Sequence, residues 1–194
     1  MREPQPRQGR DLHLVAQEPT LVTTTADRRL AAEHWLLAGS SDRDRTRAEW
    51  RTQGVAMFPL GVRFSAVRLP GALVLAAAGL RWPARADEFL GEVLEGGPVI
   101  CDPRGDLRYY ALVPASVPVT WHQAVEEWRA MDVDCLGRES IMGIPRLGEV
   151  EPNRRPPASY WSVPMASPGE LCAPLAVARL IAAGRHQLGE RTER

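Results

Sequence analysis

The sequence predicts a single α/β or α+β domain in which a mixed or largely antiparallel sheet is flanked by helices. Three observations favour this fold class. Short apolar runs bounded by Gly, Pro and Asp alternate with amphipathic segments of helical periodicity. A hydrophobic content of 44% with 25% charged residues is ordinary for a globular protein. The 194 residues contain neither an internal repeat nor a composition break, so one domain is expected over 20–188.

The two ends are expected to lie outside this domain. Residues 1–19 are polar and contain three prolines, which predicts a mobile tail, and the ending GERTER at 189–194 predicts a frayed terminus. The N-terminus has no apolar signal core. The longest apolar run, 69–80, is well short of the roughly 20 residues that span a bilayer. A cytoplasmic protein with no membrane partner is therefore expected.

Two helices are predicted to open the domain. Apolar residues recur at helical spacing over 26–38, and Gly39 is well placed to end that helix. A polar helix is expected over 42–52, because Ser41 and Asp44 resemble a capping box. The residues expected to be buried are Leu30, His34, Leu37 and Ala38 in the first helix and Trp50 in the second.

The middle of the chain alternates between predicted strands and helices. Strands are expected at 55–60 and 62–68, and a short buried helix at 71–79. An amphipathic helix is expected over 84–95, closed by two glycines. Its predicted buried residues are Phe89, Leu90, Val93 and Leu94.

The clearest hairpin signal joins strands at 98–101 and 108–113. The turn between them, Asp102 to Asp106, combines the fixed dihedral of Pro with the permissive one of Gly. Its charged residues invite a metal or phosphate site, but turn chemistry of this kind more often serves backbone geometry. We therefore expect an exposed turn between two paired strands.

The last third is expected to hold two helices and three strands. Thr120 and Gln123 resemble a capping box for a helix through Met131, with Val125 and Trp128 on its buried side. A long loop over 147–158 separates the last two strands. The predicted strands are 132–136, 140–144 and 159–163, and a final helix over 174–187 begins at Pro174.

Charge and cysteine usage narrow the functional classes. The formal net charge is zero, so no global positive field would attract nucleic acid, and any such binding requires a local patch. All 24 basic residues are Arg, which suits bidentate contacts to phosphate or carboxylate. Three scattered cysteines without a CxxC pair favour buried free thiols over a metal or disulfide site. The common phosphate-loop, dinucleotide, esterase and metalloprotease motifs are absent from the sequence.

The order of segments resembles the N-terminal primase/polymerase domain of plasmid and phage replication proteins, in the archaeo-eukaryotic primase superfamily. The closest likeness is to small actinobacterial proteins described as primase/polymerase-like. GVAMFPLG resembles the opening strand of that domain, and VRFSAVRLP occupies the place of the strand with two metal-binding acids. GDLRYYALVP resembles the strand that offers a histidine to the triphosphate. VDCLGRESIMGIP and SYWSVP are similar to the late acidic strand and the closing aromatic strand.

The resemblance implies a site from which most catalytic groups have been lost. The first acids would fall near Ser65 and Val67, and the histidine at or beside Tyr109, whereas the third motif keeps Asp132 and Asp134 as residual catalytic candidates. Two-metal phosphoryl transfer needs several converging carboxylates. No metal ligand set is therefore expected, and Mg²⁺ or Mn²⁺ would be needed only by an active site. The candidate nucleotide- or phosphate-binding residues are Arg63, Ser65, Arg108 and Tyr109.

Two functions from different classes remain open on this basis. The first is a primase/polymerase-like domain, related to DNA replication proteins and catalytically degenerate, that binds nucleotide or nucleic acid weakly. The second is a non-enzymatic regulatory or interaction protein that keeps the fold as a scaffold and whose partner is another protein. A small-molecule binder that uses the former nucleotide cleft is a third option.

Overall fold

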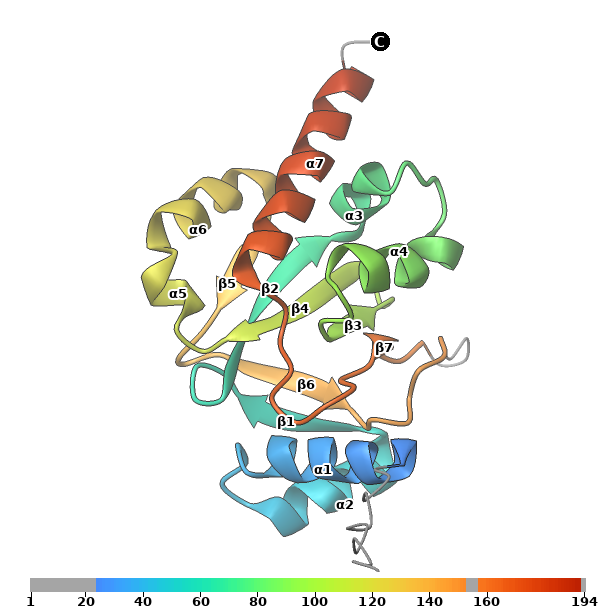
Figure 1. Cartoon of the computed structure of the whole chain (residues 1–194), viewed down its shortest axis with the longest axis vertical. Helices are drawn as coiled ribbons and strands as arrows, with labels where there is room; N and C mark the ends of the chain where they lie inside the picture. The colour runs from blue at the N-terminus through green and yellow to red at the C-terminus, as the bar shows by residue number, and fades with distance from the viewer. Residues whose placement is uncertain (1–23, 153–156, 193–194) are drawn as a thin grey trace, which may run out of the picture.

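A computed structural model describes residues 24–152 and 157–192 of the chain (Figure 1). The predicted N-terminal tail lies outside these residues. The fold is mixed α and β, as predicted, and forms one domain with two antiparallel sheets and, within the described ranges, seven α-helices. Each neighbouring strand pair is antiparallel, so the expected largely antiparallel sheet is confirmed.

The larger sheet has five strands in the order β5-β2-β4-β3-β7. The central strands β2 and β4 pair over seven residues, from Phe64 opposite Pro114 to Pro70 opposite Arg108. Both faces of β2 are covered for most of its length, which explains its nearly continuous apolar sequence. The strands are β2 (Phe64–Pro70), β3 (Val99–Asp102), β4 (Arg108–Pro114), β5 (Asp134–Leu136) and β7 (Tyr160–Val163).

Helices cover one face of this sheet. In Figure 1, α7 crosses the face and projects beyond it, with α5 and α6 on its left and α3 and α4 on its right. Apolar side chains of α3, α4, α6 and α7 pack with every second residue of the strands in one core cluster. The helices are α3 (Gly71–Ala77), α4 (Ala86–Val93), α5 (Val117–Thr120), α6 (His122–Trp128) and α7 (Pro174–Thr192), with short 3₁₀ turns η1 (Pro83–Arg85) and η2 (Arg129–Met131).

The second sheet covers part of the opposite face. It consists of β1 (Val55–Pro59) and β6 (Ile141–Pro145), and helices α1 (Thr25–Leu37) and α2 (Arg43–Gln53) lie beyond it at the bottom of Figure 1. Trp161 of β7 joins the two sheets, because its indole Nε1 donates a hydrogen bond to the carbonyl of Pro145 at 3.0 Å. A second core cluster fills the space between these elements.

The predicted hairpin is confirmed. Strands β3 and β4 pair in register, from Val99 opposite Ala111 to Asp102 opposite Arg108. The turn between them is exposed at its tip, and Gly105 adopts a φ of 62°, which suits a residue without a side chain.

Three local predictions were wrong in detail. The buried face of α1 consists of Ala32, Leu36 and Leu37, so the prediction for Leu37 is confirmed, whereas Leu30 is 53% exposed and His34 is also exposed. Apolar residues surround this helix on several sides, so the surface it packs against decides which are buried. The N-cap of α2 is Asp42 rather than Ser41, because the Asp42 side chain accepts from the Arg45 amide at 3.0 Å.

The third difference concerns the predicted helix from Thr120 to Met131. It is divided into α5, α6 and η2, and the Thr120 hydroxyl bonds back to the Ser116 carbonyl at 3.1 Å instead of capping a new helix. Its buried residues, Val125 and Trp128, are as predicted. The final helix begins at Pro174 as expected and continues to Thr192, beyond the predicted end at 187.

Candidate functional site

One face of the larger sheet changes from apolar to polar along its strands. Phe64 and Ala66 of β2 pack in the core beneath β1 and β6, and two residues farther along the same face stands Arg68. Its direct neighbours across the sheet are Asp134 on β5 and Tyr110 on β4. The polar end of the sheet is therefore built from three adjacent strands.

Four charged residues form a connected group there, which we call the Arg–Asp quartet. Arg68 Nη2 contacts a carboxylate oxygen of Asp134 and lies 3.5 Å from Asp132 Oδ1. Arg108 Nη2 lies 2.9 Å from Asp132 Oδ2, so Asp132 bridges the two guanidinium groups. All four side chains are between one quarter and a little over one half exposed, and a solute can reach the group. The two positive and two negative charges of the quartet balance, and the exposed Asp106 adds a further carboxylate 3.9 Å from Arg108 Nη2.

Two details of the quartet are unusual. Asp132 ends η2 with a φ of 56°, a left-handed conformation that Asp tolerates better than most residues. This turn places its carboxylate between the arginines. The Nε of Arg68 is buried and has no hydrogen-bond partner among the described residues, so one donor of this guanidinium remains unused.

A second charged pair extends the polar face along β3. Arg104 Nε and Nη2 hold both oxygens of Asp102 at 2.8 and 2.9 Å, and Nη2 also lies 3.3 Å from Ser159 Oγ. Burial opposes ionisation of Asp102, but the hydrogen bonds and charge of Arg104 outweigh it, and the pKa of Asp102 is lowered. A cavity of about 190 Å³ lies between this pair, Tyr110 and β6. Burial, followed by the charge of Asp102, raises the pKa of Tyr110.

Several residues that the sequence singled out lie elsewhere. Ser65 and Tyr109 stand on the helix-covered face of the sheet and are fully buried, as is Val67. The Ser65 hydroxyl donates to the Ala115 carbonyl at 3.3 Å. Burial raises the pKa of Tyr109, and its hydroxyl finds no partner in the part of the chain that the structure describes. These side chains do not share a face with Arg108 and Asp134.

Arg63 is also separate from the quartet. It precedes β2 at the end opposite Arg68, and its guanidinium lies 6.0 Å from the centroid of the Trp35 ring. Of the predicted site residues, the structure brings together only Arg108, Asp132 and Asp134. It adds Arg68, which sequence reasoning missed. The available signal was strand alternation, because Arg68 is the single charged residue of β2.

The chemistry open to this site is limited. Within residues 24–152 and 157–192, no group of three or more His, Cys, Asp or Glu residues could hold a metal ion. Both acids of the quartet are already paired with arginine. Burial raises the pKa of Cys101 and of Cys172 to about 12 and that of Cys135 to about 11, so these thiols are protonated at neutral pH. The accessible charged groups left at this end of the sheet are the guanidinium groups of Arg68 and Arg108 and the carboxylates paired with them.

Comparison of the chain with models of protein families, with curated proteins and with solved structures finds no match. No helix in the described part of the chain is long and apolar enough to cross a membrane.

Proposed function

We propose that this protein is a catalytically degenerate relative of primase/polymerase domains that binds a phosphate-bearing ligand, either a nucleotide or a nucleic-acid backbone. The observation that carries the proposal is the convergence of Arg68 and Arg108 at one accessible end of the sheet. A guanidinium group presents its N–H donors in a fork that matches phosphate oxygens, and it stays charged at any physiological pH.

Strand geometry supports the degenerate assignment. Asp134 lies directly opposite Arg68, and side chains alternate along a strand. Two acids that shared a metal with Asp134 would have to lie on the same face of the sheet as Asp134. On β2 that face carries positions 66 and 68, each one residue later than the positions 65 and 67 expected from the sequence. These positions hold Ala66 and Arg68. A shift of one residue in the opposite direction along the sequence moves the expected histidine from Tyr109 to Arg108, on the same face of the sheet as Arg68.

This alignment accounts for the ion pairs of the quartet. A guanidinium stands at a position where an active relative would carry a metal-binding carboxylate, and it pairs with the remaining aspartate. The positive charge that a metal ion would otherwise supply next to phosphate then comes from arginine. Binding is retained in this proposal, whereas activation of an attacking hydroxyl is lost.

Binding through the quartet should be weak, because Asp132 and Asp134 compete with the ligand for the arginines. We expect dATP and a single-stranded oligonucleotide to bind with dissociation constants on the order of 0.1–1 mM, without a requirement for Mg²⁺. Isothermal titration calorimetry measures binding of dATP, and fluorescence anisotropy measures binding of the oligonucleotide. The absence of saturable binding for both, up to about 10 mM dATP, would refute the proposal.

Three single substitutions assign the binding to the quartet. Arg108→Gln should weaken dATP binding by about tenfold, since a charge-assisted hydrogen bond contributes about 1.5–3 kcal/mol. Asp132→Asn should tighten it, because Arg108 loses its competing carboxylate. Arg45→Gln is the matched control, because Arg45 is paired with Glu49 on the surface of α2. Equal effects of Arg108→Gln and Arg45→Gln would contradict a site at the quartet.

A separate assay addresses catalysis. The purified protein should neither prime nor extend a strand with nucleotides and Mg²⁺ or Mn²⁺, since only Asp132 and Asp134 remain of the expected acids. Template-dependent synthesis that survives repurification and disappears in Asp134→Ala would overturn the degenerate assignment.

A second candidate, a non-enzymatic interaction protein, is favoured by one observation on the outer side of the smaller sheet. Met57 and Ile141 lie on its two paired strands and are 54% and 67% exposed. Exposed apolar neighbours of this kind occur at protein interfaces. This alternative predicts that the native protein associates in sedimentation experiments and that Ile141→Asp abolishes the association. Unchanged association in that variant would refute the role of this surface.

A further inference from the structure

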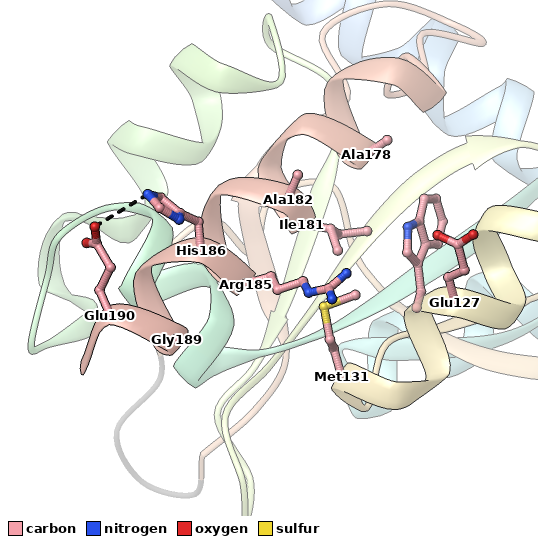
Figure 2. Close-up of a pocket in the computed structure, with 10 residues that line it drawn as sticks. Glu127, Met131, Ala178, Ile181, Ala182, Arg185, His186, Gly189 and Glu190 are labelled. Carbon is pink, nitrogen blue, oxygen red and sulfur yellow. Dashed lines mark ion pairs between the residues drawn. The ribbon is translucent and has the colours of Figure 1, made fainter. Parts of the chain in front are cut away.

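A groove separates α7 from α6 and η2 on the helical side of the larger sheet, across the sheet from the quartet (Figure 2). Its volume is about 640 Å³. Sites for small organic ligands commonly enclose about 300–1,000 Å³ and often lie between packed helices. The groove is therefore large enough for a small organic molecule.

The floor of the groove is apolar and already ordered. Trp128 and Ile181 line it and are buried members of the helical core, so their positions are set by packing against the sheet. Ala178 and Ala182, one helical turn apart on α7, line it with short side chains that leave the space open. A planar or aliphatic body in this groove would lie against the indole ring without first displacing a side chain from the core.

One cation stands over this floor. The Arg185 side chain extends from α7 across the groove toward Met131 (Figure 2). Its guanidinium makes no ion pair or hydrogen bond with any residue in the described ranges. The neighbouring His186 and Glu190 also line the groove, and they are paired with each other, with 3.5 Å between His186 Nε2 and Glu190 Oε1 (Figure 2). Arg185 is thus available to an anion.

Glu127 of α6 limits the charge of that anion. It lines the groove and lies more than 4 Å from the Arg185 guanidinium, since the two form no ion pair. This carboxylate and that of Glu190, which also lines the groove, repel a second negative charge on the ligand. The groove accordingly favours a single anionic group over a polyphosphate.

We propose that the groove between α6 and α7 binds a small amphiphilic anion, whose aromatic or aliphatic body lies against Trp128, Ala178 and Ala182 and whose single acidic group pairs with Arg185. This inference goes beyond the proposed function, because the two sites lie on opposite sides of the sheet and differ in chemistry. Phosphate esters with several charges suit the quartet, and monoanions with an apolar body suit the groove.

Two fluorescent probes with the same type of body test the proposal. Anilinonaphthalene sulfonate carries one negative charge, and N-phenylnaphthylamine carries none. We expect saturable one-to-one binding of the anionic probe to the native protein, tighter than that of the neutral probe. Arg185→Gln should weaken binding of the anionic probe by about five- to tenfold and leave binding of the neutral probe unchanged, because one charge-assisted contact is removed.

Further variants locate the probe in the groove. Ala182→Trp should abolish binding of both probes, because the new side chain fills the groove from an exposed position of α7. Glu127→Gln should tighten binding of the anionic probe, because a repelling carboxylate is removed. Arg179→Gln is the control, because Arg179 is an exposed arginine of the same helix outside the lining of the groove. Circular dichroism confirms that each variant is folded.

Several results would overturn the proposal. These are an absence of saturable binding of the anionic probe, equal weakening of both probes by Arg185→Gln, and full binding in Ala182→Trp. Loss of dATP binding in the quartet variants with unchanged probe binding would separate this site from the proposed function.

Discussion

Close packing of α7 against α3 can be tested by making the same substitution at two glycines of one helix. A Cβ added at Gly184 would lie 2.7 Å from the backbone oxygen and 2.7 Å from Cγ of Leu73, whereas one added at Gly189 meets no atom within 4 Å. Ordinary contacts of a Cβ are 3.4–4 Å. The Leu73 oxygen belongs to the backbone of α3, so Gly184→Ala must push the two helices apart.

The two substitutions should have opposite signs. Replacing Gly by Ala inside a helix stabilises it by up to about 1 kcal/mol, and this gain applies to both positions. Overpacking a tight contact destabilises by about 1–3 kcal/mol and applies only to Gly184. Gly184→Ala should therefore be less stable than Gly189→Ala by about 1–3 kcal/mol. For a chain of this size, that corresponds to roughly 2–4 °C in melting temperature per kcal/mol.

Urea unfolding followed by far-UV circular dichroism measures both free energies of unfolding. The slope of the free energy against urea should be unchanged, so that the midpoints report stability alone. If Gly184→Ala and Gly189→Ala stabilise the protein equally, α7 does not approach α3 as described, and the reasoning fails.

Three further measurements test the core and its titrating groups. Trp161→Ala should lower the free energy of unfolding by about 3–5 kcal/mol, because Trp161 is 1% exposed. Trp82→Ala is the control, because Trp82 is 78% exposed, and it should change the free energy of unfolding by less than about 0.5 kcal/mol. A loss under about 1 kcal/mol for Trp161→Ala would contradict the burial of this side chain. Burial raises the pKa of Asp87 above its ordinary value of 3.8, against the effect of its hydrogen bonds from Ser162 and Tyr160. The folded state then binds more protons than the unfolded state, so the stability of Asp87→Asn relative to the native protein should increase as pH rises above that value. The pKa of Asp102 is lowered, so the stability of Asp102→Asn relative to the native protein should decrease as pH rises. Urea unfolding at several pH values measures both trends. A change in the same direction for the two variants would contradict the opposite pKa shifts of Asp87 and Asp102. A thiol reagent at neutral pH should react slowly with the native protein and quickly after unfolding. Rapid labelling of the native state would contradict the burial of Cys101 and Cys172 and the raised pKa of the half-buried Cys135.

Local signals in the sequence determined most of the secondary structure. Alternating apolar residues around a turn with Pro and Gly predicted the β3–β4 hairpin, and Pro174 marked the first turn of α7. Such signals act between residues that are close in sequence, so they can be recognised without the fold. The burial of Val125 and Trp128 followed in the same way from helical spacing.

Only the tertiary structure decided which residues meet at the site. Because the side-chain period of a strand is two, a shift of one residue moves an entire set of side chains to the other face, and this shift separates Ser65 and Tyr109 from Arg68 and Arg108. The pairing of β5 with β2 places Asp134 opposite Arg68, a contact between residues 66 positions apart that no local pattern encodes. Likewise, Leu30 is exposed and Leu36 buried in α1, because the surface against which that helix packs selects one of several apolar faces. The sequence by itself thus determined the elements and their order, and long-range packing decided which of their faces carry the charged groups.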